Sequence, residues 1–510
     1  MRLTRRQFVA LSAGMTVPLV GGSWIERALG AAEKRGGTVT VGLNTDLVSL
    51  DPNDIVFANA PMFFQVYNYL VKFSVSLQPR PDLAEAWDLA KDAMSVVFRL
   101  RDGIRTHSGG IFNAEALIAN FRRTKTQTTG GGLFSRLEDW VAADALDART
   151  VRFRFSRAHP DYLAQVARWG MVDPAAFATV KSRGGGTGPF KVQEWVPGDH
   201  VTFVRFDGYW QQGLPLADRV VGRVFTDPQA LENAFQAGAL DIAHTIPNKD
   251  VQRIRQGGFR ITPSPVPNEY YVLTINTRKP PLDNIKVRQA IQLLVDREAI
   301  VRTVLGGVGG PTVQMVTPGS LGYDPKLVAE YGFNPAKAKA LLAQSGANGI
   351  RLNFLTSTST PELPQIAQII QADLKQAGIE SSIRILEPAQ YFPAYFAGNF
   401  DLNLSFLTLA TIDPTDFTIS SAFRTNATNP SWLQTGPPRE YGEAVQSLNT
   451  TANLRDRWIR LRSVVRYILE QAWAVPVALR LPTFGLAKGV EGFTVDPQML
   501  IQLRSVWLNR

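Results

Sequence analysis

The segment 350–386 limits most tightly what this chain can fold into, because it predicts a strand, a helix and a second strand in succession. Residues 350–355 are strand-like. Apolar residues then recur on one helical face, at Ile366, Ile369, Ile370 and Leu374. Gly378 supplies the left-handed residue that ends a helix, and residues 382–386 return as a strand. Such a unit gives a partly parallel sheet with helices on its face, so we predict an α/β fold.

Local signals place further elements on both sides of this unit. Residues 37–44 alternate small or polar residues with apolar ones, which predicts a strand. Asn334 followed by Pro335 is the pattern of a helix N-cap and first turn. It predicts a helix over 336–343 that stops at Gly346.

Two more helices and a break are predicted from similar patterns. A helix with an apolar stripe that includes Val287 and Ile291 follows Asp283. Another follows Asp296 and ends near the glycine pair 306–307. The glycine-rich run 184–189 is the clearest break in the chain, and it is a candidate domain crossover.

Length and cysteine content narrow the class of protein. The chain has 510 residues, beyond the ~250 to 300 at which a single core stops growing, so two or three domains are expected. It has no cysteine. This excludes disulfides, cysteine-ligated iron-sulfur clusters, covalently attached haem and a lipidated cysteine anchor. We expect no cofactor.

The N-terminus resembles a twin-arginine export signal. Arg5 and Arg6 precede an apolar stretch, 8–22, that is too short for the ~20 residues of a spanning helix. Small residues follow, and cleavage after Ala32 or near Gly30 would release a protein into the periplasm. The alternative is an ordinary amphipathic helix with two chance arginines.

Charge gives no sign of a nucleic-acid partner. The net charge is +10, and removal of residues 1–32 takes away four arginines and one glutamate, which leaves +7. Because no lysine- or arginine-rich run occurs, a solvated basic surface explains this excess better than nucleic-acid binding does.

A set of short segments, in a fixed order over nearly the whole chain, resembles the extracytoplasmic solute-binding proteins of the peptide and nickel class (family 5), which feed ABC importers. The segments are 77–87, 98–104, 113–115, 186–191, 209–210, 240–242, 281–283, 287–291, 296–300, 373–379, 400–401 and 413–414. Most of these residues are scaffold, so they identify the fold better than the ligand.

The resemblance implies a two-lobed periplasmic-binding-protein fold with an extra domain, mixed sheets flanked by helices, and a hinge between the lobes. After the signal 1–32, lobe I would comprise 33–70, 187–270 and 476–510. The extra domain would be 71–186, and lobe II 271–475. The protein would close around a peptide-like or other small organic solute and present it to the membrane subunits of an ABC permease, acting as a monomer.

Two other functions share features with this one. A periplasmic hydrolase is disfavoured because no zinc-protease, serine-hydrolase or phosphate-loop motif occurs. The four histidines, His107, His159, His200 and His244, are too far apart for a local metal motif. Asp413 and Asp416 could do acid/base work, but an Asp-Pro turn explains Asp413 better. A receptor-coupled or chaperone-like binding protein would have the same fold.

The stretch 400–417 bears on the solute. In peptide-binding relatives it carries a tryptophan and, three residues later, an aspartate that pairs with the α-ammonium of the peptide. The corresponding residues here are Leu407 and Ala410. The resemblance therefore implies that the charge partner is missing, unless Asp413 replaces it through a rearranged turn.

Several residues are candidate ligand contacts. Leu404, Phe406, Leu407 and Leu409 could line an apolar pocket or simply alternate along a buried strand. Asn44, Tyr270, Tyr271 and Thr408 complete the predicted set. Tyrosine suits such a cleft because its ring stacks while its hydroxyl forms hydrogen bonds. Blocked peptides, amino-acid conjugates, sugars and aromatic solutes all stay open.

Overall fold

The computed structural model describes most of the chain beyond the N-terminal segment. The described residues are 34–54, 62, 65–75, 77–126, 137–267, 269–318, 322–409, 413, 415–420, 422–426, 428–432, 435–497 and 500–510. The predicted signal 1–32 and Ala410 lie outside them.

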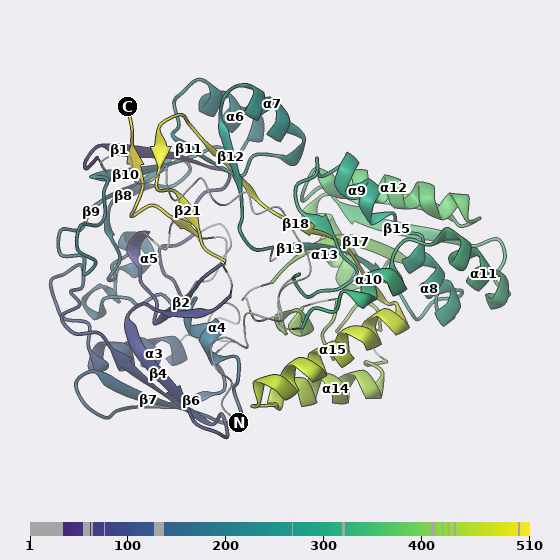
Figure 1. Ribbon diagram of the computed structural model, residues 1–510, viewed down its shortest axis with the longest axis horizontal. Helices are drawn as coiled ribbons and strands as arrows, with labels where there is room; N and C mark the ends of the chain where they lie inside the picture. The colour runs from purple at the N-terminus through teal and green to yellow at the C-terminus, as the bar shows by residue number, and fades with distance from the viewer. Residues whose placement is uncertain are drawn as a thin grey trace, which may run out of the picture.

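A seven-stranded mixed sheet forms one part of the molecule (Figure 1). In spatial order its strands are β12 (Arg260–Pro263), β19 (Thr483–Leu486), β11 (Ile242–His244), β1 (Thr38–Leu43), β10 (Arg219–Val224), β9 (His200–Arg205) and β8 (Phe190–Val196). The predicted strand at 37–44 is confirmed as β1, which pairs in parallel with β10 and β11. Helices α6 (Pro228–Gln236) and α7 (Val251–Gln256) pack beside it through Leu231, Phe235 and Ile254.

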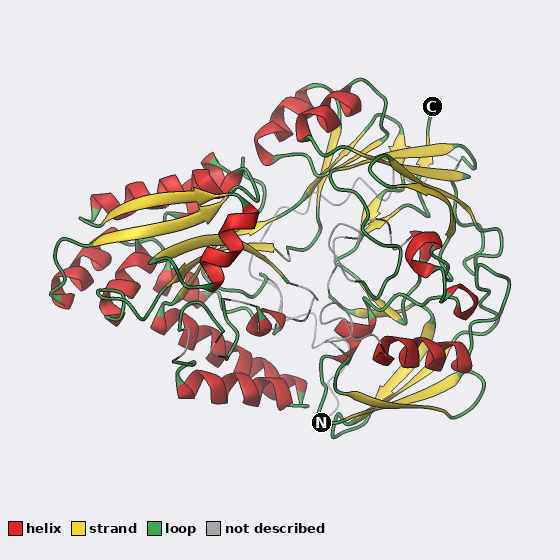
Figure 2. Ribbon diagram, turned by 180° about the vertical axis from the view of Figure 1, so that it is seen from behind, coloured by secondary structure: helices red, strands yellow, loops and turns green. Residues whose placement is uncertain are grey.

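A six-stranded sheet forms the other side of Figure 1. Its order is β14 (Gly310–Pro311), β18 (Ala474–Arg480), β13 (Glu269–Ile275), β17 (Leu402–Thr408), β15 (Arg351–Ser357) and β16 (Glu380–Leu386). Helices cover both of its faces, as Figure 2 shows from behind. One face packs on α8 (Ile285–Leu293), α9 (Arg297–Thr303), α11 (Pro335–Ser345) and α12 (Glu362–Gln376). The other packs on α10 (Lys326–Tyr331), α13 (Pro388–Phe396), α14 (Arg439–Thr450) and α15 (Leu454–Gln471).

The local predictions in this half are confirmed. The unit β15–α12–β16 contains a parallel strand pair, and Gly378 has the left-handed φ of 83°. Asn334 caps α11 by accepting a hydrogen bond from the backbone N–H of Lys337, and Gly346 ends the helix with φ 70°. These patterns are local, so neighbouring residues were sufficient to predict them.

A smaller antiparallel sheet lies beside the seven-stranded one. Its strands are β4 (Ala84–Leu89), β5 (Ser95–Leu100), β7 (Thr150–Phe155) and β6 (Trp140–Ala145), and α3 (Ala114–Thr126) covers one face. Its core is aromatic, with Trp140 between Phe153 and Phe155 at ring-centroid distances of 5.0 and 4.8 Å. Short elements complete the described part: β2 (Val71–Phe73) with β3 (Pro79–Pro81), α4 (Tyr162–Val166), α5 (Val180–Arg183), β20 (Val490–Glu491) with β23 (Trp507–Leu508), and β21 (Thr494–Val495) with β22 (Ile501–Gln502).

The glycine-rich run 184–189 joins α5 to β8 through close packing. A Cβ on Gly188 would lie 2.4 Å from the carbonyl carbon of Val66, and one on Gly186 would lie 2.6 Å from the Val66 oxygen. His107 holds the same loop, because its Nδ1 accepts from Gly186 N–H at 3.1 Å and its Nε2 lies 3.0 Å from the Gly188 carbonyl oxygen. Glycine is therefore required here by the approach of another backbone segment.

Two chain crossings connect the seven- and six-stranded sheets. One leads from β12 to β13, and the other leads from Arg480 at the end of β18 to Thr483 at the start of β19. They run side by side, since Ser264 N–H donates to the Pro482 carbonyl at 2.8 Å. Paired crossings of this kind let two bodies turn about one line.

The second crossing lies later in the chain than predicted. We placed the end of lobe II at 475, but β18 stays in the six-stranded sheet through Arg480. The strand extends this far because residues 474–479 are apolar and buried, with some side chains packed on one face of that sheet and the rest on the other. The first crossing ends two residues earlier than predicted, because β13 enters the six-stranded sheet at Glu269 and not at 271. The division into lobes itself stays a prediction.

Candidate ligand-binding site

The carboxyl ends of the parallel strands in the seven-stranded sheet carry two polar side chains in contact. Asn44 directly follows β1, and its Oδ1 lies 3.2 Å from Nδ1 of His244, the last residue of β11. The Thr245 hydroxyl lies 3.3 Å from the same nitrogen. Thr245 has φ 67°, a left-handed conformation that is an outlier for a β-branched residue. The chain thus turns sharply at this edge, which we call the first edge.

Asn44, Thr245 and His244, the described polar residues of the first edge, carry no charge near neutral pH. Burial lowers the pKa of His244 to about 4. Its ring packs edge-on against Phe484, with the centroids 5.3 Å apart. Asn44 and His244 can therefore exchange hydrogen bonds with a ligand but cannot balance a ligand charge.

A second edge, in the six-stranded sheet, is charged. The register aligns Glu269 at the start of β13 with Thr408 at the end of β17 and Arg480 at the end of β18. Arg480 forms an ion pair with Glu269, and the Thr408 hydroxyl donates to the same carboxylate at 3.2 Å. The Arg480 guanidinium also lies 5.7 Å from the ring centroid of Phe406.

This ion pair is mostly shielded from solvent. The side chains of Arg480 and Glu269 are 17% and 9% exposed. Burial acts to lower the pKa of Arg480, but Glu269 and neighbouring acidic groups outweigh it and raise the pKa. The guanidinium is therefore a fixed positive charge beside the crossing segments.

The two predicted tyrosines lie on opposite faces of β13, and both are fully buried. Tyr270 packs among the residues of α14 and α15, and its hydroxyl lies 3.0 Å from that of Thr317. Burial raises its pKa to about 12. Tyr271 packs on the opposite face, against the α8 and α12 side. A contact between either ring and ligand stays a prediction.

The apolar residues of β17 divide between core and edge. Leu404 and Leu409 are buried in core clusters. Phe406 and Leu407 are half-buried and lie on opposite faces of the strand. Leu407 and Thr408 thus reach the second edge, while Ala410 lies outside the described residues.

Asp413 is already engaged by the protein. Its Oδ2 accepts from Arg457 at 2.8 Å, and its Oδ1 accepts from the backbone N–H and the hydroxyl of Thr415 at 2.8 and 2.7 Å. The side chains of Arg457 and Asp413 are only 3% and 9% exposed. The role that the sequence left open for this carboxylate would require breaking a buried ion pair.

Sequence reasoning missed Glu269, Arg480 and His244. Glu269 directly precedes the two predicted tyrosines, and Arg480 ends an apolar strand, so a charge at the end of a buried run was the available signal. Their pairing spans 211 positions and follows from strand register alone. Among the described residues, no cluster of histidine and acidic side chains could hold a metal ion.

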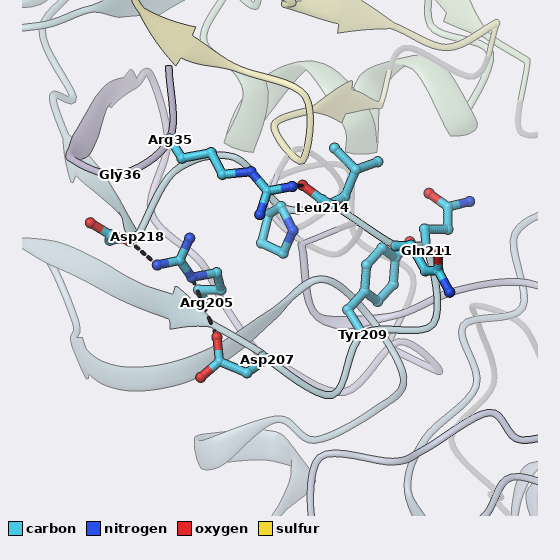
Figure 3. Close-up of a pocket in the computed structure, with 11 residues that line it drawn as sticks. Arg35, Gly36, Arg205, Asp207, Tyr209, Gln211, Leu214 and Asp218 are labelled. Atoms are coloured by element: carbon cyan, nitrogen blue, oxygen red, sulfur yellow. Dashed lines mark hydrogen bonds and ion pairs between the residues drawn. The ribbon is translucent and has the colours of Figure 1, made fainter. Parts of the chain in front are cut away.

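A separate surface hollow lies away from both edges. It has a volume of about 700 Å³ and is lined by Arg35, Arg205, Asp207 and Tyr209 among others (Figure 3). It lies at the amino ends of β1 and β10, opposite the first edge. The charged groups that line it have partners within the protein. Arg205 forms ion pairs with Asp207 and Asp218, and Arg35 donates a hydrogen bond to the Gly213 carbonyl oxygen at 3.1 Å.

Comparison with known proteins decides the family. Residues 78–429, more than two thirds of the chain, match the family model of bacterial extracellular solute-binding proteins, family 5. This chain belongs to that family. It is 26% identical to the dipeptide-binding protein of Escherichia coli K12 over 471 residues, which cover 85% of this chain and 87% of that protein. It is also 27% identical to the glutathione-binding protein GsiB of the same strain, over 69% and 70% of the two chains.

Solved structures agree on the fold. The binding protein AgaA from A. tumefaciens R10, in complex with agropinic acid, superposes with a TM-score of 0.75 at 23% identity and covers 93% of this chain and 99% of its own. The predicted periplasmic-binding-protein fold is confirmed. As a family 5 member, this protein is an extracytoplasmic, solute-binding component of an ABC importer. No helix in the described part of the chain is long and apolar enough to cross a membrane.

Proposed function

We propose that this protein closes its two sheet edges around a peptide-like or amino-acid-derived solute and passes the solute, unreacted, to an ABC permease. One observation carries the proposal: polar groups from both sheets collect where the two crossings run side by side. In α/β proteins, ligands bind outside the carboxyl ends of strands. Relatives named for dipeptide, glutathione and agropinic acid indicate the size and chemistry of such solutes.

The preferred solute lacks a free α-ammonium group. Leu407 and Ala410 stand where peptide binders carry tryptophan and aspartate, and Asp413 is engaged by Arg457 and Thr415. Glu269, at the start of β13, is likewise engaged by Arg480. A hydrogen bond to a charged group contributes about 1.5 to 3 kcal/mol, so a solute whose ammonium has no partner binds roughly 10- to 150-fold more weakly.

A thermal-shift screen tests this proposal directly. It compares unblocked di- and tripeptides with their N-acetylated counterparts and with sugars and aromatic acids. A solute at 100 times its dissociation constant stabilises the fold by about 2.7 kcal/mol, which is measurable as a shift of a degree or two. We expect shifts from blocked members of the panel and none from unblocked dipeptides at equal concentration. Micromolar binding of unblocked dipeptides would contradict the selectivity argument.

Export by the twin-arginine route and a monomeric state are parts of the same proposal. The N-terminal Arg5 and Arg6 support the route. Replacing both with lysine should leave precursor in the cytoplasm, and a wild-type yield in the periplasm would refute the route. Light scattering on the purified protein should give the mass of one chain.

A further inference from the structure

The connections that follow the neighbouring strands β15 and β16 lead to opposite faces of the six-stranded sheet. The chain passes from β15 into α12, which packs on the face that contains Phe354. From the neighbouring strand β16 it passes into α13, whose Tyr391 and Tyr395 pack on the other face against Leu355. Adjacent strands whose connections diverge in this way leave a crevice at their carboxyl ends, where α/β proteins bind ligands.

Three buried polar atoms lie at this place without a full hydrogen bond to any described residue: Oε2 of Glu362, the hydroxyl of Tyr271 and the hydroxyl of Thr360. Glu362 is the first residue of α12 and is 6% exposed, and Thr360 is also 6% exposed. The Thr360 hydroxyl lies beside that of Tyr271 without full hydrogen-bond geometry. Since buried polar groups are nearly always paired, three such atoms together call for a partner that the described residues do not supply.

The charges around Glu362 indicate that the missing partner is a cation. Glu362 interacts electrostatically with Tyr271 and Arg480, but the Arg480 guanidinium forms its ion pair with Glu269. Among the described residues, the group therefore contains two carboxylates and one guanidinium, so Glu362 has no cation of its own. A buried carboxylate oxygen without a partner is costly, and a cation that binds there recovers this cost.

We propose that Glu362, together with the hydroxyls of Tyr271 and Thr360, binds a cationic nitrogen of the solute, an ammonium or a guanidinium. This rests on the proposed function and deepens it. The solute carries its basic nitrogen away from the α-amino position, for instance on a side chain, because the α-amino position has lost its acid. An oxygen of Glu362 accepts the charged hydrogen bond, and the two hydroxyls accept the remaining N–H groups.

A matched pair of probes tests the inference. N-acetyl-alanyl-lysine and N-acetyl-alanyl-norleucine both lack the α-ammonium, and their side chains differ in the terminal charge. We expect the wild-type protein to bind the lysine probe at least roughly 10-fold more tightly by isothermal titration calorimetry. Glu362→Gln should abolish this preference and leave the norleucine affinity within about twofold. Tyr271→Phe should reduce the preference in part, and it gives a second variant if Glu362→Gln folds poorly.

Glu380→Gln is the matched control, because Glu380 is an exposed acid at the opposite end of β16. It should retain the wild-type preference. Equal wild-type binding of both probes, or a preference that survives Glu362→Gln, would overturn the inference. If neither probe binds but another member of the screening panel does, an unchanged affinity of Glu362→Gln for that solute overturns it as well. Failure of the wild-type protein to bind any solute contradicts the proposed function itself, and the inference with it.

Discussion

The two edges that meet at the crossing segments differ in charge. At the first edge, Asn44 and His244 offer neutral hydrogen-bonding groups, because burial keeps the imidazole unprotonated at pH 7. At the second edge, Arg480 and Glu269 form a mostly buried ion pair, and the buried side chain of Glu362 lies within electrostatic range of Arg480. Both edges lie at carboxyl ends of parallel strands, so the difference comes from side chains and not from topology.

This difference separates two tasks. The second edge, which is charged, selects a solute by its ionic groups, because burying an unpaired charge there is energetically unfavourable. The first edge, which is neutral, can contact a solute bound at the second edge only when the two sheets approach each other. It can then add hydrogen bonds without a large desolvation cost. Closure on a ligand requires that the ligand bind the closed state better than the open one, and contacts from both edges provide that difference.

The largest expected effect is a loss of folding stability when the ion pair of the second edge is broken. Arg480→Met removes the partner of Glu269 and leaves two buried carboxylates without a cation, so the free energy of unfolding should fall by about 3 to 5 kcal/mol. Urea denaturation followed by fluorescence measures this. The matched control is Arg466→Met, whose partner Glu330 lies on the surface with both side chains over 40% exposed. It should leave the free energy of unfolding nearly unchanged, because solvent-exposed ion pairs contribute little. Similar losses in the two variants would contradict a special role for the second edge.

A smaller effect, on ligand affinity, is expected when the acid of peptide binders is restored at position 410. Ala410→Asp should strengthen binding of unblocked dipeptides by roughly 10- to 150-fold, because a new carboxylate can pair with the α-ammonium. Calorimetric titration with the same peptides before and after acetylation measures the gain. Acetylated peptides are the control and should gain nothing. An equal gain for both forms would show that the substitution acts through something other than charge.

The smallest effect is a pH dependence that originates at the neutral edge. His244 has a pKa of about 4 in the folded state, against about 6.5 in an unfolded chain. Between these values the unfolded chain binds a proton that the folded chain does not, so stability falls as the pH drops from about 6.5 to 4. Each pKa unit corresponds to 1.36 kcal/mol, so the loss from pH 7 to 4.5 should be about 2 kcal/mol smaller in His244→Asn than in wild type.

His200→Asn is the control for this measurement, because hydrogen bonding to Asp199 raises the pKa of His200. A group with a raised pKa stabilises the fold at low pH and loses that contribution as the pH rises. The His200 variant should therefore show no reduced acid loss. An identical acid loss in wild type and His244→Asn would refute a neutral, buried His244.

The sequence predicted the local elements well and the site only in part. The cap at Asn334, the stripe of α12 and the stop at Gly378 depend on residues within one or two turns, so their patterns were sufficient. Leu407 and Thr408 lie near the end of β17 at the second edge, and their contact with a ligand stays a prediction. The partners there were not predictable, because Glu269 meets Arg480 through the register of two strands far apart in the chain.

For Tyr271, the sequence pattern could not predict the orientation or the neighbours of the side chain. The sequence suggested a ring that stacks on a ligand, which stays a prediction; in the structure the ring packs in the core, and the hydroxyl forms no full hydrogen bond with a described residue. Which face of β13 each tyrosine takes depends on strand register, and the hydroxyl's neighbours Thr360 and Glu362 come from a loop and helix about ninety positions later. Their contribution to a site becomes visible only when burial is known.

The central claim is that the two edges close on a solute without chemical change to it. Small-angle X-ray scattering, with and without a saturating solute from the thermal-shift screen, tests this most directly when the solute is recovered and weighed by mass spectrometry. We predict a smaller radius of gyration in the presence of the solute and an unaltered solute mass. An unchanged radius of gyration at saturation, or a solute returned with a different mass, would contradict the account.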